Sequence, residues 1–154
     1  MAEHLYLKLD GIDGSCDKDG HKKWIEIDSY SHGISYGVGS GKDFSGQVDH
    51  SPLSVSKLVD NSTHLIIQKL NRREQIKEII LEIWKDGGSG STGKVTSAAI
   101  IIKLTNCRVS SYSMGGSDTG TLPNESISFA YQAIHWTFPG SKPTDHDFSK
   151  PFGA

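Results

Sequence analysis

The sequence predicts a mainly β fold, either a sandwich or a barrel, that carries one short helix. Segments in which apolar and polar residues alternate occur along most of the chain. Clusters of glycine, serine and aspartate separate these segments, as expected for turns. Strands do not alternate regularly with helices, which disfavours a doubly wound fold. A chain of 154 residues is expected to form one domain with one core.

The first half of the chain contains three expected strands. Leucines alternate with polar residues over 5–9, which indicates a half-buried strand. A second strand is expected over 24–36, with Ile25 and Ile27 on its core face. A third is expected over 53–59.

A short helix is expected directly after the third strand. Asp60, Asn61 and Ser62 offer side chains that cap a helix N-terminus, so the sequence predicts a helix over 63–70. Its apolar stripe would consist of Leu65, Ile66 and Leu70.

The second half of the chain returns to strands. Residues 76–85 alternate well and precede a glycine- and serine-rich stretch, 86–93, that is typical of a hairpin loop. The next expected strand, 97–113, is long for a single strand, so we expect a bend or a bulge in it. A turn over 115–123 leads to a last strand over 125–138.

The motifs that suggest an enzyme do not withstand inspection. Residues 88–93 match the glycine pattern of dinucleotide-binding loops, and with the next lysine they nearly match a phosphate-binding loop. Val95 stands where such a loop needs a hydroxyl, and the residues that follow are strand-like rather than helical. Glu78 and Glu82 share a strand face as a glycosidase pair could, but charged residues on a solvated strand are far commoner. We therefore expect no enzyme activity.

Composition excludes further classes. The net charge of −2 excludes a strongly basic nucleic-acid binder, and no apolar run is long enough for membrane insertion. The seven histidines lack metal-ligand spacing, so we expect neither a metal nor a cofactor. Cys16 and Cys107 do not form a CxxC pair. The N-terminus lacks the features of a signal peptide, so synthesis is expected in the cytoplasm.

Glycine and serine together make up about a quarter of the chain and gather in a few connections. One of them is the segment 37–46, GVGSGKDFSG, whose single aromatic residue is Phe44. We refer to residues 37–46 as the arm. An aromatic side chain on a glycine-rich arm is suited to docking on a neighbouring subunit. The alternative is that Phe44 folds back onto its own core.

Six segments in this order make the chain recognisable from Leu5 to about Phe138. The sequence resembles the haemolysin-coregulated protein (Hcp) family, the tube proteins of bacterial type VI secretion systems. The matching segments are YLKLDGIDG (6–14), DKDGHKKWIEIDSYSHGI (17–34), the arm (37–46), LSVSKLVDNSTHLI (53–66), IIIKLTNCRVSSYS (100–113) and ESISFAYQAIHWTF (125–138).

The resemblance implies an Hcp-like domain over 1–139, a small β-barrel of two sheets flanked by a short helix, with a polar tail over 140–154. It implies a homohexameric ring, stacked rings and a tube driven by a contractile sheath behind tip (spike) proteins. The tube would carry effector proteins in its lumen and leave the cell without a signal peptide. Ser31 is the expected lumen contact. The arm residues expected to contact a neighbouring subunit or ring are Gly37, Gly39, Gly41, Phe44 and Gly46.

Two other readings stay open from the residues alone. One is a small β-barrel that binds a ligand or acts as an enzyme. The other is a phage-type tail tube protein outside secretion.

Overall fold

The computed structural model describes residues 3–18, 20–36, 48–85, 100–118, 122–138 and 143–147. Within this part of the chain the fold is mainly β with a single helix, as predicted. The elements in chain order are β1 (Glu3–Leu9), β2 (Ile25–Glu26), β3 (Ser29–Ser31), β4 (Ile34–Tyr36), β5 (Val48–His50), β6 (Leu53–Leu58), α1 (Thr63–Asn71), β7 (Ile76–Lys85), β8 (Ile100–Gly115), β9 (Asn124–Ala130), β10 (Ala133–Thr137) and β11 (Thr144–Asp147).

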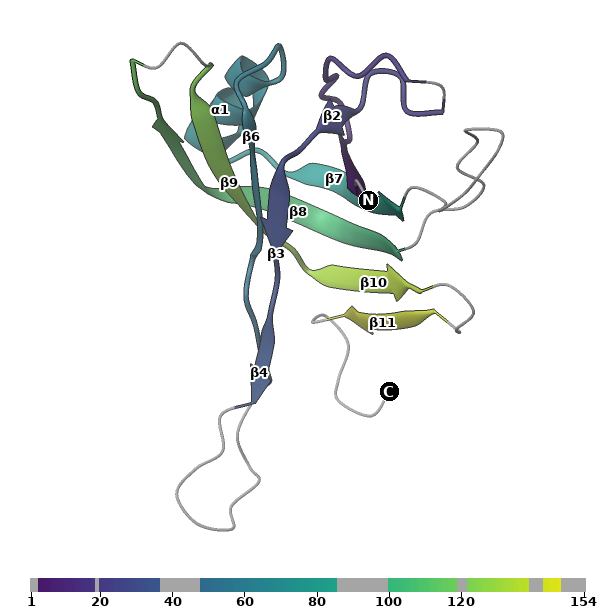
Figure 1. The fold of residues 1–154 in the computed structure, drawn as a ribbon. Coiled ribbons are helices and arrows are strands. Elements are labelled where there is room, and N and C mark those ends of the chain that lie inside the picture. Colours follow the sequence, from purple (N-terminus) through teal and green to yellow (C-terminus); the bar gives the residue numbers. More distant parts are fainter. Residues whose placement is uncertain are drawn as a thin grey trace, which may run out of the picture.

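The long strand β8 belongs to two sheets (Figure 1). Its first half, 100–107, pairs with β7, and its second half, 108–115, pairs with β9. Within the second half the register shifts between Val109 and Ser111, so the expected bulge in a long strand is confirmed. The first sheet has the order β2-β1-β7-β8-β10-β11, and the second has the order β8-β9-β6-β3. All of these pairs are antiparallel.

The chain crosses between the two sheets a second time at the corner between β2 and β3. The Ile27 amide donates to the Leu5 carbonyl of the first sheet at 3.2 Å, and the Asp28 amide donates to the Ser56 carbonyl of the second at 2.8 Å. Because each half of this corner pairs with a different sheet, β2 and β3 form no ladder with each other. The two sheets and the helix are confirmed, but the expected barrel is not closed.

The same corners explain why two expected strands are divided. The expected strand over 24–36 is split into β2, β3 and β4, and that over 125–138 into β9 and β10. The second break falls at Tyr131 and Gln132, where the chain leaves the second sheet and enters the first. Alternation alone cannot reveal these breaks, since both parts of each segment remain extended. Part of the polar tail also extends the first sheet as β11.

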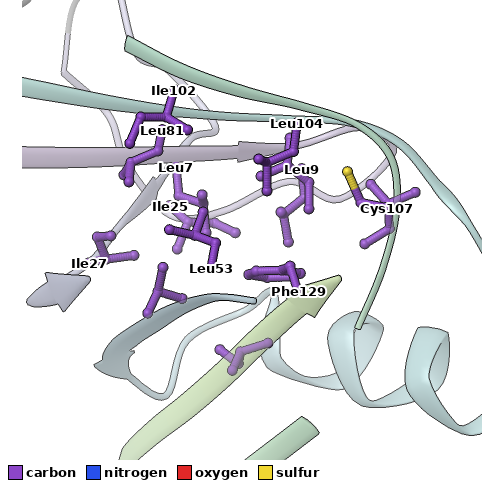
Figure 2. Packing of buried hydrophobic residues seen from close by; sticks show 14 of the residues in the cluster. Leu7, Leu9, Ile25, Ile27, Leu53, Leu81, Ile102, Leu104, Cys107 and Phe129 are labelled. Carbon is purple, nitrogen blue, oxygen red and sulfur yellow. The ribbon is translucent and has the colours of Figure 1, made fainter. Parts of the chain in front are cut away.

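The core lies between the two sheets (Figure 2). Leu7 and Leu9 of β1 face Leu53 of β6 and Phe129 of β9, and all four side chains are almost fully buried. Residues 76–85 also alternate as predicted, with their inward isoleucines and leucine buried. These faces confirm the core positions that the alternation predicted.

The helix α1 confirms the prediction to within one residue, and its Ile66 is fully buried. Ser62 occupies the N-cap position, but its side chain makes no hydrogen bond to the helix backbone. Its hydroxyl instead donates to the carboxylate of Asp60 at 2.5 Å. The predicted cap residues therefore gather at the helix start with a different bonding pattern.

The strands β4 and β5 form a separate two-stranded hairpin that projects away from the two sheets (Figure 1). Across the described residues, none of the helical structure has the length and apolarity that a membrane crossing requires.

Candidate functional site

The outer face of the second sheet carries two rows of serines, and one of them contains Ser31. Strand registers place four serines side by side in each row, one from each of β3, β6, β9 and β8. We call these eight residues the serine face. The first row consists of Ser31, Ser54, Ser128 and Ser111, and the second of Ser29, Ser56, Ser126 and Ser113.

The serine face is neutral and partly bonded to itself. Within the rows, the hydroxyls of Ser29 and Ser56 lie 2.5 Å apart, and those of Ser54 and Ser128 lie 2.9 Å apart. Neighbouring serine positions are spaced by about 4.8 Å across strands and about 6.8 Å along them, which are the spacings of a β-sheet. Since each hydroxyl both donates and accepts, a partner can find hydrogen bonds at every position of this face. Because serine side chains are small, a partner can also approach the backbone of this sheet closely.

Ser31 occupies the end of its row because β3 is an edge strand. Among the described strands, β3 pairs with β6 alone. An edge strand offers backbone donors and acceptors to a further strand, so Ser31 lies where a neighbouring chain could extend the sheet. The sequence prediction for Ser31 as a lumen contact stays a prediction.

The hairpin of β4 and β5 emerges directly after this edge. Tyr36 lies opposite Val48 and Ile34 lies opposite His50, so these four side chains share one face of the hairpin. Ile34 is 52% exposed and Val48 is 48% exposed, which is unusual for aliphatic side chains of their size. The predicted arm residues, Gly37, Gly39, Gly41, Phe44 and Gly46, lie outside the described residues. The hairpin strands that flank the arm in the sequence therefore expose apolar side chains on one face.

Two histidines meet one tyrosine at the base of the hairpin. The hydroxyl of Tyr131 lies 2.5 Å from Nε2 of His32 and 3.1 Å from Nδ1 of His50. Burial lowers the pKa of His32 and raises the pKa of Tyr131 to about 12. Sequence reasoning missed this cluster, because its three members come from separate parts of the chain and share no spacing.

A second unpredicted cluster lies inside the second sheet beside α1. Lys57 is fully buried and forms ion pairs with Glu125 and with Asp60, the latter at 2.8 Å. Glu125 also accepts hydrogen bonds from Thr63 at 2.9 Å and from Tyr112 at 2.6 Å. Burial raises the pKa of Tyr112, and the bond to ionised Glu125 adds to the rise, which reaches about 12. Every member is bonded, so the cluster joins α1 to the sheet.

The candidate catalytic pair that the sequence raised is divided between different partners. Glu82 bonds to Nε2 of His21 at 2.6 Å and accepts from the Trp84 indole at 2.8 Å. Glu78 pairs instead with Lys103 at 3.3 Å. Among the described residues, no group of three or more histidine, cysteine or acidic side chains could hold a metal ion.

The two thiols are unpaired and buried. Burial raises the pKa of Cys16, and it raises that of Cys107 to about 12. A thiol that stays protonated at neutral pH is a poor nucleophile.

Comparison with known proteins supplies the identity. A family profile described as "Type VI secretion system effector, Hcp" matches residues 6–138. A solved structure titled as that of a type six secretion system protein is 30% identical, covers 88% of this chain and 83% of its own, and superposes with a TM-score of 0.78. Hcp1 from Salmonella typhimurium is 22% identical, covers 96% of both chains and also has a TM-score of 0.78. A type VI secretion system effector from Yersinia pestis is 18% identical, covers 93% and 98% of the two chains and has a TM-score of 0.76. A search of curated proteins finds no match.

The family profile and these relatives identify this mainly β domain as a component of the type VI secretion system. The chain belongs to the Hcp family, whose members are secreted structural tube proteins rather than enzymes. The resemblance inferred from the sequence is thereby confirmed.

Proposed function

We propose that the chain closes with five further copies into a ring, that these rings stack into the secretion tube, and that the serine face lines the lumen and carries effector proteins. The observation that carries this proposal is the position of Ser31. Ser31, the expected lumen contact, lies at the edge of a sheet face that carries two rows of hydroxyls, and this supports the proposal.

Ring closure through sheet edges is supported by the ends of the strand order. β3 ends the second sheet and β11 ends one branch of the first, so each subunit offers backbone hydrogen-bonding groups at two sides. Heterologous contacts of this kind generate closed rings when the rotation between copies closes. The exposed apolar hairpin face supports a further contact, in which the arm reaches a neighbouring subunit or ring.

The mass in solution tests the ring. Light scattering is expected to report about 100 kDa, six times the 16.8 kDa of one chain. Deletion of residues 37–46 is expected to preserve the fold, seen by circular dichroism, and to weaken stacking or ring closure in sedimentation. A wild-type mass near 17 kDa would contradict the ring. Unchanged sedimentation of the deletion variant would contradict the role of the arm.

Cargo carriage has a separate test. Ser31→Arg is expected to leave the ring mass unchanged and to reduce binding of a small effector from the same secretion system at least about tenfold, because a long charged side chain blocks close approach to the serine face. The matched control is Ser15→Arg in the exposed loop after β1. Equal binding by both variants would remove Ser31 from the cargo contact.

The serine face also predicts how cargo binding responds to salt. A contact built on neutral hydroxyls gains little from long-range charge attraction, so binding is expected to change less than about twofold between low and high salt.

The tube subunit would move past a contractile sheath and behind tip (spike) proteins, which are its further proposed partners.

A further inference from the structure

The cluster of His32, His50 and Tyr131 ties the hairpin to the body of the subunit. His32 lies in the link between β3 and β4, His50 ends β5, and Tyr131 lies in the turn between β9 and β10. The two imidazoles therefore come from the two ends of the hairpin, one just before β4 and one at the end of β5, and the hydroxyl comes from the body. A cavity of about 500 Å³, lined in part by His50, Ser51 and Tyr131, opens beside the cluster.

The hydrogen-bond pattern fits neutral imidazoles. The Tyr131 hydroxyl has one proton to donate, and its oxygen can accept from an N–H group. One neutral histidine then accepts from the hydroxyl while the other donates to it. A protonated histidine has only donors, so protonation of both would leave the tyrosine proton to turn elsewhere. The nearby Ser51 carbonyl lies 3.4 Å from the hydroxyl, which is a poor replacement.

Two protonated imidazoles at this place would repel each other. The rings of His32 and His50 have centroids 6.1 Å apart, so two positive charges would repel each other. The Trp136 ring of β10 lies 6.1 Å from His32 and 6.3 Å from His50 and brings no charge.

Among the described residues, few charged groups lie on the elements around the cluster. Asp49 of β5 lines the same cavity, and Arg108 of β8 lies opposite Ala130, the residue before Tyr131. His135 of β10 pairs with Asp145 at 3.6 Å. For His32 the cause of the lowered pKa is burial, with no contribution from any of these charges.

We propose that His32, His50 and Tyr131 form a pH-sensitive latch, which holds the β4–β5 hairpin against the turn between β9 and β10 at neutral pH and loosens it on acidification. The strands β4 and β5 flank the arm in the sequence. The latch would therefore determine how tightly the base of the arm is held to the subunit. The inference concerns contacts within one chain and does not rest on the ring.

The direction of the pH effect follows from the folded state. The pKa of His32 is lower in the closed junction than its ordinary value near 6.5. An opened junction therefore takes up a proton more readily, and the closed form loses stability as pH falls below about 6.5. The loss continues until pH reaches the folded pKa, below which both forms are protonated.

Hydrogen exchange followed by mass spectrometry tests the latch. After correction for the intrinsic exchange rate, amide protection over 34–36 and 48–50 is expected to fall severalfold between pH 7.5 and 5.0, because the opened junction binds a proton more readily than the closed one. Protection of β7 in the same molecules should stay constant, and light scattering at each pH verifies that the state of assembly is unchanged.

Variants separate the latch from general acid sensitivity. The double variant His32→Gln with His50→Gln retains hydrogen-bonding amides but cannot titrate, so its hairpin protection should be independent of pH. The matched control is His64→Gln, an exposed position on α1, which should behave as wild type.

Two results would overturn the latch. One is a wild-type hairpin whose protection changes in step with that of β7. The other is a double variant that keeps the full pH dependence. Should the double variant fail to fold, NMR titration of the wild-type imidazoles decides: the midpoint of His32 must coincide with the loss of hairpin protection, and a separate midpoint refutes the proposal.

Discussion

Lys57 and Glu125 face each other across β6 and β9 on the inner side of the second sheet, whereas Ser56 and Ser126 face each other on its outer side. The two pairs are immediate chain neighbours. The inner pair is charged and fully buried, and the outer pair is neutral and reaches the surface. This reverses the ordinary distribution, in which charged side chains are solvated and interiors are apolar.

The difference indicates that the two faces serve different purposes. The buried ions hold α1 on the sheet through directional bonds to Asp60 and Thr63, which an apolar contact would not supply. Ions buried in this way add orientation more than stability. On the outer face, neutral hydroxyls present a surface that neither attracts nor repels a partner through charge. Such a surface fits contact with cargoes of varied charge.

Lys57→Ala is the change expected to break the inner face most severely. Removing the ammonium leaves the buried Glu125 and the half-buried Asp60 without their countercharge, so the free energy of unfolding should fall by about 3–5 kcal/mol. Urea denaturation followed by circular dichroism measures this change. The matched control is Lys103→Ala, whose exposed pair with Glu78 should contribute about 0–1 kcal/mol.

A paired replacement tells the ionic bond from the packing of the lysine stem. Lys57→Met with Glu125→Leu removes both charges and keeps apolar volume, so it should be more stable than Lys57→Ala. An equal loss in the single and double variants would mean that the space filled by Lys57, rather than its charge, carries the effect.

The sequence contains a signal for this cluster, which is a charged residue at an inward position of an alternating strand. Leu53 and Val55 point inward, so Lys57 falls on the same face, and Glu125 shares a face with Ile127 in the same way. A charged residue at an inward position of each strand predicts a buried ion pair. The pairing itself needs the register of β6 and β9, which a single strand pattern does not contain.

The serine face and the cluster of His32, His50 and Tyr131 are harder to predict from the sequence than the buried ion pair is. Abundant serine at alternate positions predicts wet strand faces, but only the registers of β3, β6, β9 and β8 align them into two rows. His32, His50 and Tyr131 are brought together by the corners between sheets, and the breaks at those corners were not predicted. Local alternation therefore predicts the core faces well, while long-range register determines the candidate sites.

Acidification is expected to lower the free energy of unfolding through Asp60, by less than Lys57→Ala does and by more than Ser54→Ala does. Burial would raise the pKa of Asp60, but hydrogen bonds from Lys57 and Ser62 lower it below its ordinary value. The unfolded chain therefore binds a proton before the folded chain does, and stability present above about pH 4 is lost as pH falls toward the folded pKa.

Asp60→Asn tests this linkage by urea denaturation at pH 7 and pH 3. The variant should be less stable than wild type at pH 7, and the gap between the two should narrow at pH 3, because the unfolded wild-type chain binds a proton at Asp60 more readily than the folded chain does. Asp118→Asn, at an exposed position, is the matched control. A gap that stays constant across this range would mean that the Asp60 charge does not contribute.

Ser54→Ala is expected to have the smallest effect. It removes the 2.9 Å bond to Ser128 on the outer face, and a single hydrogen bond near water contributes about 0.5–1 kcal/mol to the free energy of unfolding. Ser110→Ala, at an exposed position of the β8 bulge, should change it by less than about 0.5 kcal/mol. A loss above about 2 kcal/mol for Ser54→Ala would make the serine rows part of the structural framework. A small loss together with weaker effector binding instead indicates that these hydroxyls act through contact with a partner, which is what separates the outer face from the inner one.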